Sequence, residues 1–300
     1  MSRVYSLLVF LSIQGAMPVF AQEDFTWWND IHAWDGVTPW VSYMTVSPSY
    51  FGPNALPVPE LRNGLIDSIG RAEADAGAFW SSGDETYDSR LRLSIPVARG
   101  KVTLESYVVP VEFYSMDTIT RDVRAARDRD GKGRAGGDIH FSTQVAILKD
   151  RARWPDLEFE AAFRTASGTR LGAARYTDAP GYHFSVSGGR DLKQLKGGMT
   201  LRLYGCAGFY AFQTYDPRQL QNDCFLWGAG IDIRNRHWCL SNQLTGYAGH
   251  QSNGDRPMVF RSNLQLMGGK SDAIIRFQWG LQDFAYTSLH IGWIRNFDLK

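Results

Sequence analysis

The chain has 300 residues, a formal net charge of +1 and a mean hydropathy of -0.29, and it contains 30 Gly, 10 Trp, 13 Tyr and 17 Phe. The near-zero net charge gives no reason to expect nucleic acid or an acidic partner. After residue 21 no stretch approaches the ~18 uninterrupted apolar residues of a helical membrane span. The strands of a membrane barrel alternate between apolar and polar residues and contain no such run, so this absence does not exclude a membrane barrel.

The first residues have the pattern of a secretory signal peptide. Arg3 supplies the positive charge, a short apolar run covers residues 4–13, and Val19-Phe20-Ala21 fits the small-x-small cleavage pattern. A membrane anchor is the alternative, but the run falls short of the ~20 residues that a spanning helix needs. We therefore expect residues 1–21 to be removed on export, with Gln22 as the mature N-terminus.

Apolar and polar residues then alternate along many short segments, which is typical of half-buried strands. In the clearest segment, Leu91, Leu93 and Val97 share one face, while Arg90 and Arg92 share the other. The pattern predicts about twelve strands, an even number as in single-chain bacterial barrels. Their expected ranges are 40–50, 86–98, 102–115, 138–149, 156–166, 181–190, 199–213, 224–234, 237–248, 256–267, 272–282 and 287–297. Pro48 and Pro110 interrupt the first and the third of them.

The connections alternate in length, which separates a barrel from a periplasmic β-sandwich. Short connections are expected at 99–100, 150–155, 193–198, 235–236 and 268–271, and long ones at 51–85, 116–137, 167–180 and 215–223. Outer-membrane barrels have short periplasmic turns and long extracellular loops. The sequence therefore predicts an all-β fold in which residues 22–300 form one antiparallel barrel in the outer membrane of a diderm bacterium. Both chain ends are expected in the periplasm, and membrane lipids are the expected partners, with protein partners left open.

Charged residues on the polar face of the strands are expected to point into the lumen, where each needs a partner or water. Two arrangements remain open. The charges pair across a filled interior, or they line a narrow aqueous pore with anion preference. The predicted lumen-lining residues are Arg90, Arg92, Glu158, Glu160, Arg164, Arg202, Asp232, Arg261 and Arg276. The proline-rich stretch 52–59 either caps the barrel or folds into it.

A short motif, His250-Gln251-Ser252-Asn253-Gly254, follows the strand expected at 237–248. It resembles the active-site sequence of outer-membrane phospholipase A, and it is similar to the His-x-Ser-Asn element of lipid A 3-O-deacylases. Two residues apart on a strand, His250 and Ser252 point to the same side, so the imidazole can take the hydroxyl proton as general base while Ser252 attacks an ester. Resemblance to the phospholipase implies Ca²⁺ and dimerisation.

A third group should orient the histidine, and Asn263 is the nearest match to the phospholipase asparagine. Its parity, however, is that of the lumen and not that of the pair. Cys206, Cys224 and Cys239 show no metal-ligand spacing, so no metal or other cofactor is expected apart from that Ca²⁺. The sequence favours a non-enzymatic narrow channel or a structural or docking barrel. The alternative is a Ser/His lipid hydrolase.

Overall fold

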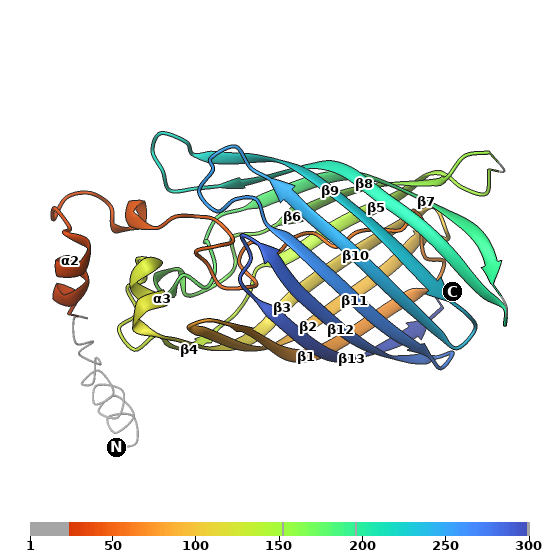
Figure 1. The fold of residues 1–300 in the computed structure, drawn as a ribbon, viewed down its shortest axis with the longest axis horizontal. Coiled ribbons are helices and arrows are strands. Elements are labelled where there is room, and N and C mark those ends of the chain that lie inside the picture. Colours follow the sequence, from red (N-terminus) through yellow and green to blue (C-terminus); the bar gives the residue numbers. More distant parts are fainter. Residues whose placement is uncertain (1–23, 152, 196, 299–300) are drawn as a thin grey trace, which may run out of the picture.

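The computed structural model describes residues 24–151, 153–195 and 197–298, so the signal peptide expected over residues 1–21 lies outside the described chain. Twelve antiparallel strands close into a barrel, in which β1 pairs with both β2 and β13 (Figure 1). The short strand β4 pairs with β3 alone, outside the ring. The fold is therefore the predicted all-β barrel of twelve strands. No helix of the described chain is long and apolar enough to cross a membrane.

The strands are β1 (Gly70–Ser81), β2 (Asp84–Ala98), β3 (Val102–Met116), β4 (Lys132–Ala135), β5 (Ile139–Leu148), β6 (Asp156–Arg164), β7 (Gly181–Leu195), β8 (Met199–Gln213), β9 (Gln221–Arg234), β10 (Trp238–Ala248), β11 (Met258–Met267), β12 (Ser271–Gln282) and β13 (Thr287–Phe297). The helical elements are α2 (Thr26–His32), α3 (Thr118–Val123) and the 3-10 turns η1 (Trp40–Tyr43) and η2 (Leu171–Ala173).

The alternation along each strand separates the two faces of the barrel wall. On β2, Leu91, Leu93 and Val97 are exposed on the outer surface, whereas Arg90 and Arg92 line an interior cavity. Large apolar side chains are exposed on the outside of most of the other strands as well, as an outer surface in contact with lipid requires.

The first predicted strand is wrong. Residues 40–50 form η1 and irregular chain, and the first strand is Gly70–Ser81, inside the stretch that was predicted to be a long connection. The outward residues of β1 include Ala74 and Ala76, which are exposed but too small to give the strong apolar alternation of β2. A tight turn with φ +82° at Gly83 then joins β1 to β2.

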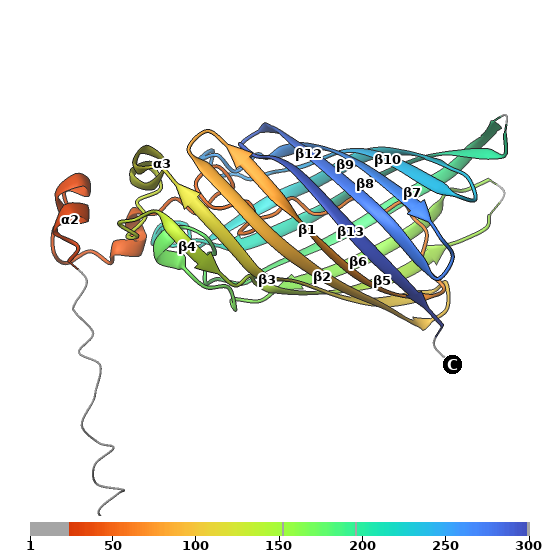
Figure 2. The ribbon, with the colours of Figure 1, turned by 90° about the horizontal axis from the view of Figure 1, so that it is seen from below.

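Apart from 51–85, which contains β1, the predicted long and short connections lie at opposite ends of the barrel. Residues 117–138, which contain α3, and residues 165–180 lie at one end, and the turn at 99–101 lies at the other. The C-terminal strand also ends at the short-turn end (Figures 1 and 2). The described chain begins at the opposite end, because α2 packs beside α3, where Trp28 Nε1 donates a 3.0 Å hydrogen bond to the carbonyl of Ala125. The expectation that both ends share one side is therefore wrong for the described residues.

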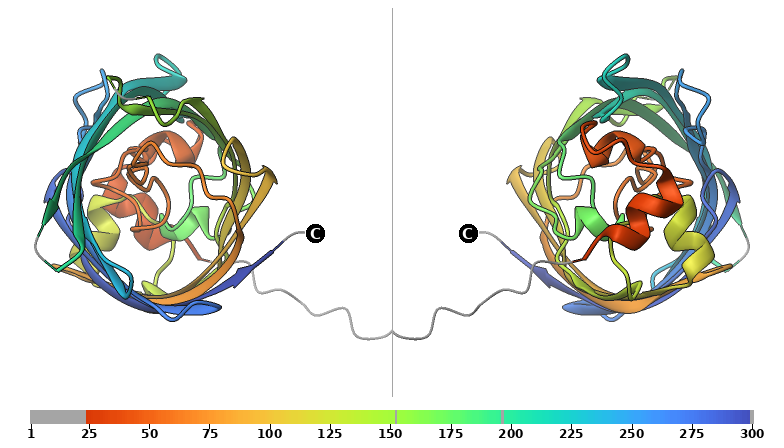
Figure 3. Two further views of the ribbon diagram at one scale, coloured as in Figure 1. Left: turned by 90° about the vertical axis from the view of Figure 1, so that its right-hand side faces the viewer. Right: turned by 90° about the vertical axis from the view of Figure 1, so that its left-hand side faces the viewer.

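Between these two ends, residues 44–69, here called the lumen segment, run through the inside of the barrel (Figure 3). At its beginning, Ser47 Oγ donates to the carbonyl of Asn253 in a connection at the long-loop end. At its end, the carbonyl of Asp67 accepts from Gly100 N in a short turn at the other end. Of the alternatives for the proline-rich stretch 52–59, the structure has the one in which it folds into the barrel.

Candidate functional site

The two residues of the predicted hydrolase pair lie in the 249–257 connection and are both exposed. β10 ends at Ala248, and Ser252 has φ +54°, so the two-residue repeat of a strand does not extend to them. Nδ1 of His250 lies 3.3 Å from the backbone nitrogen and 3.2 Å from the carbonyl oxygen of Asp223. Ser252 Oγ accepts a 3.1 Å hydrogen bond from Arg256. Among the hydrogen bonds of the described residues, none joins the imidazole of His250 to the hydroxyl of Ser252.

Asn263, the candidate orienting residue, lies on β11 and lines the interior cavities, as its parity predicts, and not the outer surface. The predicted lumen residues are also inside the barrel. Some line cavities and others are buried against the lumen segment. The structure places in the interior Arg90, Arg92, Glu158, Glu160, Arg164, Arg202, Asp232, Arg261 and Arg276.

Buried ion pairs close the long-loop end of the lumen. The fully buried guanidinium of Arg175, from the connection that contains η2, lies 2.7 Å from Glu112 and 2.8 Å from Asp84. Burial by itself lowers the pKa of Arg175, but the two carboxylates outweigh it and raise that pKa above its usual value. Asn54 of the lumen segment donates a 2.9 Å hydrogen bond to the same Glu112. The lumen segment therefore completes a network of paired charges that would otherwise be costly to bury.

Apolar side chains pack around this network. Phe51, Leu56 and Val58 of the lumen segment are buried in one cluster with Trp28 of α2 and with residues of the strands, such as Tyr247. A buried cluster of this kind stabilises the lumen segment by the area that it removes from water. It fills the long-loop end of the barrel.

Further along, wall side chains hold the lumen segment through its backbone carbonyls, and residues 44–69 form no strand pairing with the wall. The carbonyls accept hydrogen bonds from side chains of four different strands. These bonds run from Arg164 to Ala55, from Arg261 to Val58, from Gln243 to Leu61 and from Arg202 to Asn63, with donor–acceptor distances of 2.6, 2.6, 3.2 and 3.0 Å. The segment can therefore leave the lumen without the loss of a β-ladder.

Arg164 has a second role at the same place. Its Nη1 also lies 3.1 Å from a carboxylate oxygen of Asp138, just before β5. Burial raises the pKa of the Asp138 carboxyl above its usual value, although the guanidinium beside it acts in the opposite direction. Arg164 therefore joins Ala55 of the lumen segment to Asp138 of the wall, so wall side chains enclose the segment at this level.

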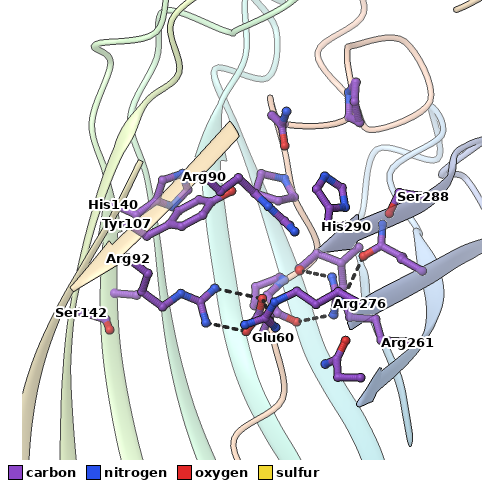
Figure 4. Close-up of a pocket in the computed structure, with 18 of the residues that line it drawn as sticks. Glu60, Arg90, Arg92, Tyr107, His140, Ser142, Arg261, Arg276, Ser288 and His290 are labelled. Carbon is purple, nitrogen blue, oxygen red and sulfur yellow. Dashed lines mark hydrogen bonds and ion pairs between the residues drawn. The ribbon is translucent and has the colours of Figure 1, made fainter. Parts of the chain in front are cut away.

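The middle of the lumen contains two charged side chains of the lumen segment. Both carboxylate oxygens of Glu60 accept 2.9 Å hydrogen bonds from the guanidinium of Arg92, and Nη1 of Arg276 lies 3.9 Å from one of them. Figure 4 shows Glu60 between these two arginines. Two residues on, Arg62 Nη2 lies 2.8 Å from Glu105 and 2.7 Å from Glu160.

Two cavities adjoin at this charged level. One of about 140 Å³ lies on its long-loop side, and one of about 350 Å³ extends towards the short turns. Glu60, Arg62, Arg92 and Arg276 line both. The residues of this level therefore separate two spaces that are each large enough for several water molecules.

Charge pairing answers the alternative left open for the lumen. Six carboxyl and five guanidinium groups line the larger cavity, so the described interior there has no cationic excess. Arg276, for example, forms a close ion pair with Glu73, and Arg202 lies 2.8 Å from Asp156. Most of the inward charges pair with one another across an interior that the lumen segment occupies, whereas Arg261 donates to neutral oxygens, such as the carbonyl of Val58. An anion preference does not follow from the arginines of the larger cavity.

Glu60 and Arg62 were missed because they belong to a stretch without strand periodicity. Proline-rich sequence before them was the signal of an unusual segment, but no spacing rule pairs a loop residue with a strand. Among the described residues no group of His, Cys, Asp or Glu is arranged to hold a metal ion. The three cysteines, Cys206, Cys224 and Cys239, are free thiols.

No protein-family model matches the chain, and no curated protein matches its sequence. Solved structures do resemble it. An outer-membrane channel from Pseudomonas putida F1 is 14% identical with a TM-score of 0.52, over 81% of this chain and 100% of that one. The NanC porin is 13% identical with a TM-score of 0.50, over 76% of this chain and 100% of that one. The chain therefore has the fold of outer-membrane barrels.

Proposed function

We propose that this chain is a non-enzymatic outer-membrane channel of narrow bore, which its own lumen segment closes. The observation that carries the proposal is the way in which residues 44–69 cross the lumen: side-chain hydrogen bonds to carbonyls hold them there, and cavities of about 140 and 350 Å³ remain on the two sides of Glu60 and Arg62. A purely structural barrel has no need of polar cavities along its axis, whereas a closed channel keeps them as parts of its path.

The proposal also places the barrel in a membrane, and the outer surface of the barrel supports this part of it. Exposed apolar side chains on the outer face of most strands of the barrel, together with the likeness to outer-membrane barrels, support insertion in the outer membrane of a diderm bacterium. Export by a signal peptide over residues 1–21 is part of this proposal and is tested by the N-terminal sequence of the mature protein.

Liposome swelling with small sugars and amino acids tests the channel. The double variant Arg261→Ala/Gln243→Ala removes three hydrogen bonds, to the carbonyls of Val58, Pro59 and Leu61 of the lumen segment, and should raise the swelling rate by roughly a hundredfold, since each bond contributes on the order of 1 kcal/mol. The matched variant Arg234→Ala/Gln265→Ala truncates the same residue types in the lumen, where they bond Asp191 and Asp272 instead. Equal rates for the two variants would contradict closure by the lumen segment.

The Ser/His hydrolase remains a separate prediction. It requires His250 to accept a proton from Ser252, whose hydroxyl here accepts from Arg256 instead. Release of fatty acid from phospholipid or lipid A, with loss of that release in Ser252→Ala and with a Ca²⁺ requirement for the phospholipase version, would establish it. The channel proposal expects no such release.

A further inference from the structure

Glu60 of the lumen segment is bound in the way that a free carboxylate would be bound. Arg92 presents two parallel N–H groups to its two oxygens, both at 2.9 Å, and Arg276 approaches one of the oxygens to 3.9 Å. Arg261 and Arg90 line the same cavity (Figure 4). The planar fork of a guanidinium matches the planar carboxylate group, so this geometry is specific as well as attractive.

Arg62 is bound by the opposite chemistry at an adjoining site, whose Glu105 also lies 3.9 Å from Arg92. Its guanidinium donates to Glu160 through Nε at 3.1 Å and Nη2 at 2.7 Å, and to Glu105 through Nη2 at 2.8 Å. Both carboxylates belong to the wall, on β6 and β3, and both side chains are largely buried. They form a fixed site for one cationic group.

The wall therefore contains two complementary sites, which the lumen segment fills with charges two residues apart. Without Glu60, Arg92 keeps Glu105, 3.9 Å from its Nε, and Arg276 keeps Glu73 and Asp75. The four wall arginines that line the cavity, Arg90, Arg92, Arg261 and Arg276, then outnumber these carboxylates, and the site is cationic.

Without Arg62, the neighbouring buried carboxylates of Glu105 and Glu160 lose the cation that lies between them and repel each other, with His183 3.5 Å from Glu160 and Arg92 3.9 Å from Glu105 as the remaining contacts. Withdrawal of the lumen segment would leave one cationic and one anionic site facing the same space.

We infer that these two sites bind a small zwitterionic solute, with a carboxylate on Arg92 and Arg276 and a guanidinium or ammonium group on Glu105 and Glu160. Glu60-Leu61-Arg62 occupies the sites as a built-in ligand while the channel is closed. The inference rests on the proposed function, because it names the solute class that the open lumen recognises. A solute with both charges gains both sites, whereas a solute with one charge leaves the other site uncompensated.

Binding to the full-length variant Glu60→Ala/Arg62→Ala tests this by isothermal titration calorimetry in detergent micelles. The probes are 4-guanidinobutyrate, which carries both groups, and butyrate and butylguanidinium, which carry one each. We expect the double variant to bind 4-guanidinobutyrate at least about tenfold more tightly than it binds either single-charge probe. We also expect the double variant to bind 4-guanidinobutyrate at least about tenfold more tightly than the wild type does. Binding of this probe should also raise the unfolding temperature of the double variant.

The matched control is Leu61→Ala/Asn63→Ala, which truncates two neighbouring residues of the lumen segment and leaves Glu60 and Arg62 in place. It should bind 4-guanidinobutyrate no better than the wild type. If the double variant does not fold, each single variant tests one site: Glu60→Ala should bind butyrate and Arg62→Ala should bind butylguanidinium. Absence of binding to the folded variants, or equal binding to the control, would overturn the inference. Calorimetry detects binding without conduction, so its negative result would contradict only the solute inference. A negative liposome-swelling result would contradict the proposed channel.

Discussion

The guanidinium of Arg127 lies 3.8 Å from the centre of the Phe25 ring, so the connection between β3 and β5 is fastened to the first described residues of the chain. The same guanidinium lies 4.9 Å from the Trp28 ring and 5.4 Å from the Trp40 ring. A cation against several aromatic faces contributes about 0.5–2 kcal/mol. The contact holds the N-terminal segment at the long-loop end.

Arg127→Ala should therefore loosen residues 24–43 while the barrel remains folded. Hydrogen exchange of α2 should become faster by a factor of about 2–30, as expected for the loss of that free energy. Arg129→Ala, in the same connection but with an exposed side chain, is the control and should change nothing. Unchanged exchange in Arg127→Ala would mean that the apolar cluster alone holds the segment.

The same helix should respond to pH through His32, whose ring centre lies 4.7 Å from that of Trp28. Burial lowers the pKa of His32 below its usual value near 6.5, and Asp122 opposes the shift in part. Protonation is then less favourable in the docked helix than in the released one, so docking is strongest above pH 6.5 and weakens as the pH falls below it. Exchange of α2, corrected for intrinsic rates, should be faster at about pH 5.5 than at about pH 7.5. His32→Gln should remove this difference, and a difference that persists in His32→Gln would assign it to another group.

The lipid-facing assignment is tested on β2, where Leu91 lies at the middle of the strand and is exposed on the outer surface. Leu91→Arg should lower the free energy of unfolding by about 2–4 kcal/mol, because a charge near the bilayer midplane loses its hydration. Gln265→Arg introduces the same side chain in the lumen, where Asp272, the present partner of Gln265, is available to pair with it. If urea unfolding showed equal losses of the free energy of unfolding for Leu91→Arg and Gln265→Arg, the assignment of Leu91 to the lipid-facing side and Gln265 to the lumen would be wrong.

The position of the N-terminal segment is tested by labelling whole cells with a membrane-impermeant maleimide. Val37, between α2 and η1, is 86% exposed at the long-loop end, and Arg236 is exposed in a short turn. Val37→Cys should be labelled on intact cells, and Arg236→Cys should be labelled after the outer membrane is permeabilised. The unsubstituted protein gives the background of its own three cysteines. The reverse pattern would invert the orientation.

Sequence periodicity was enough to predict most of the barrel, because large apolar side chains make alternation visible. On β12, Phe277 and Trp279 alternate with the inward residues Arg276 and Gln278, and the predicted and observed strands nearly coincide. β1 escaped prediction because its outward residues are mostly alanine, whose small apolar area hardly differs from that of a turn residue.

The candidate site was beyond the reach of the same reasoning. Parity places Arg92 and Glu160 in the lumen, but their partners Glu60 and Arg62 belong to an irregular segment, and no local rule sets which wall residue a loop residue meets. For His250 and Ser252, the parity argument required the strand to continue as far as Ser252, but β10 ends at Ala248. Tertiary contacts decide both cases.

Single-channel recording in planar bilayers tests most directly the claim that the lumen segment closes this barrel. The wild type should remain mostly silent, with rare and brief openings, whereas a variant that lacks residues 24–66 should conduct persistently in discrete steps. Heat-modifiable migration on gels would establish that the variant is a folded barrel. A folded variant that is as silent as the wild type, or a wild type that already conducts as well as the variant, would contradict the account.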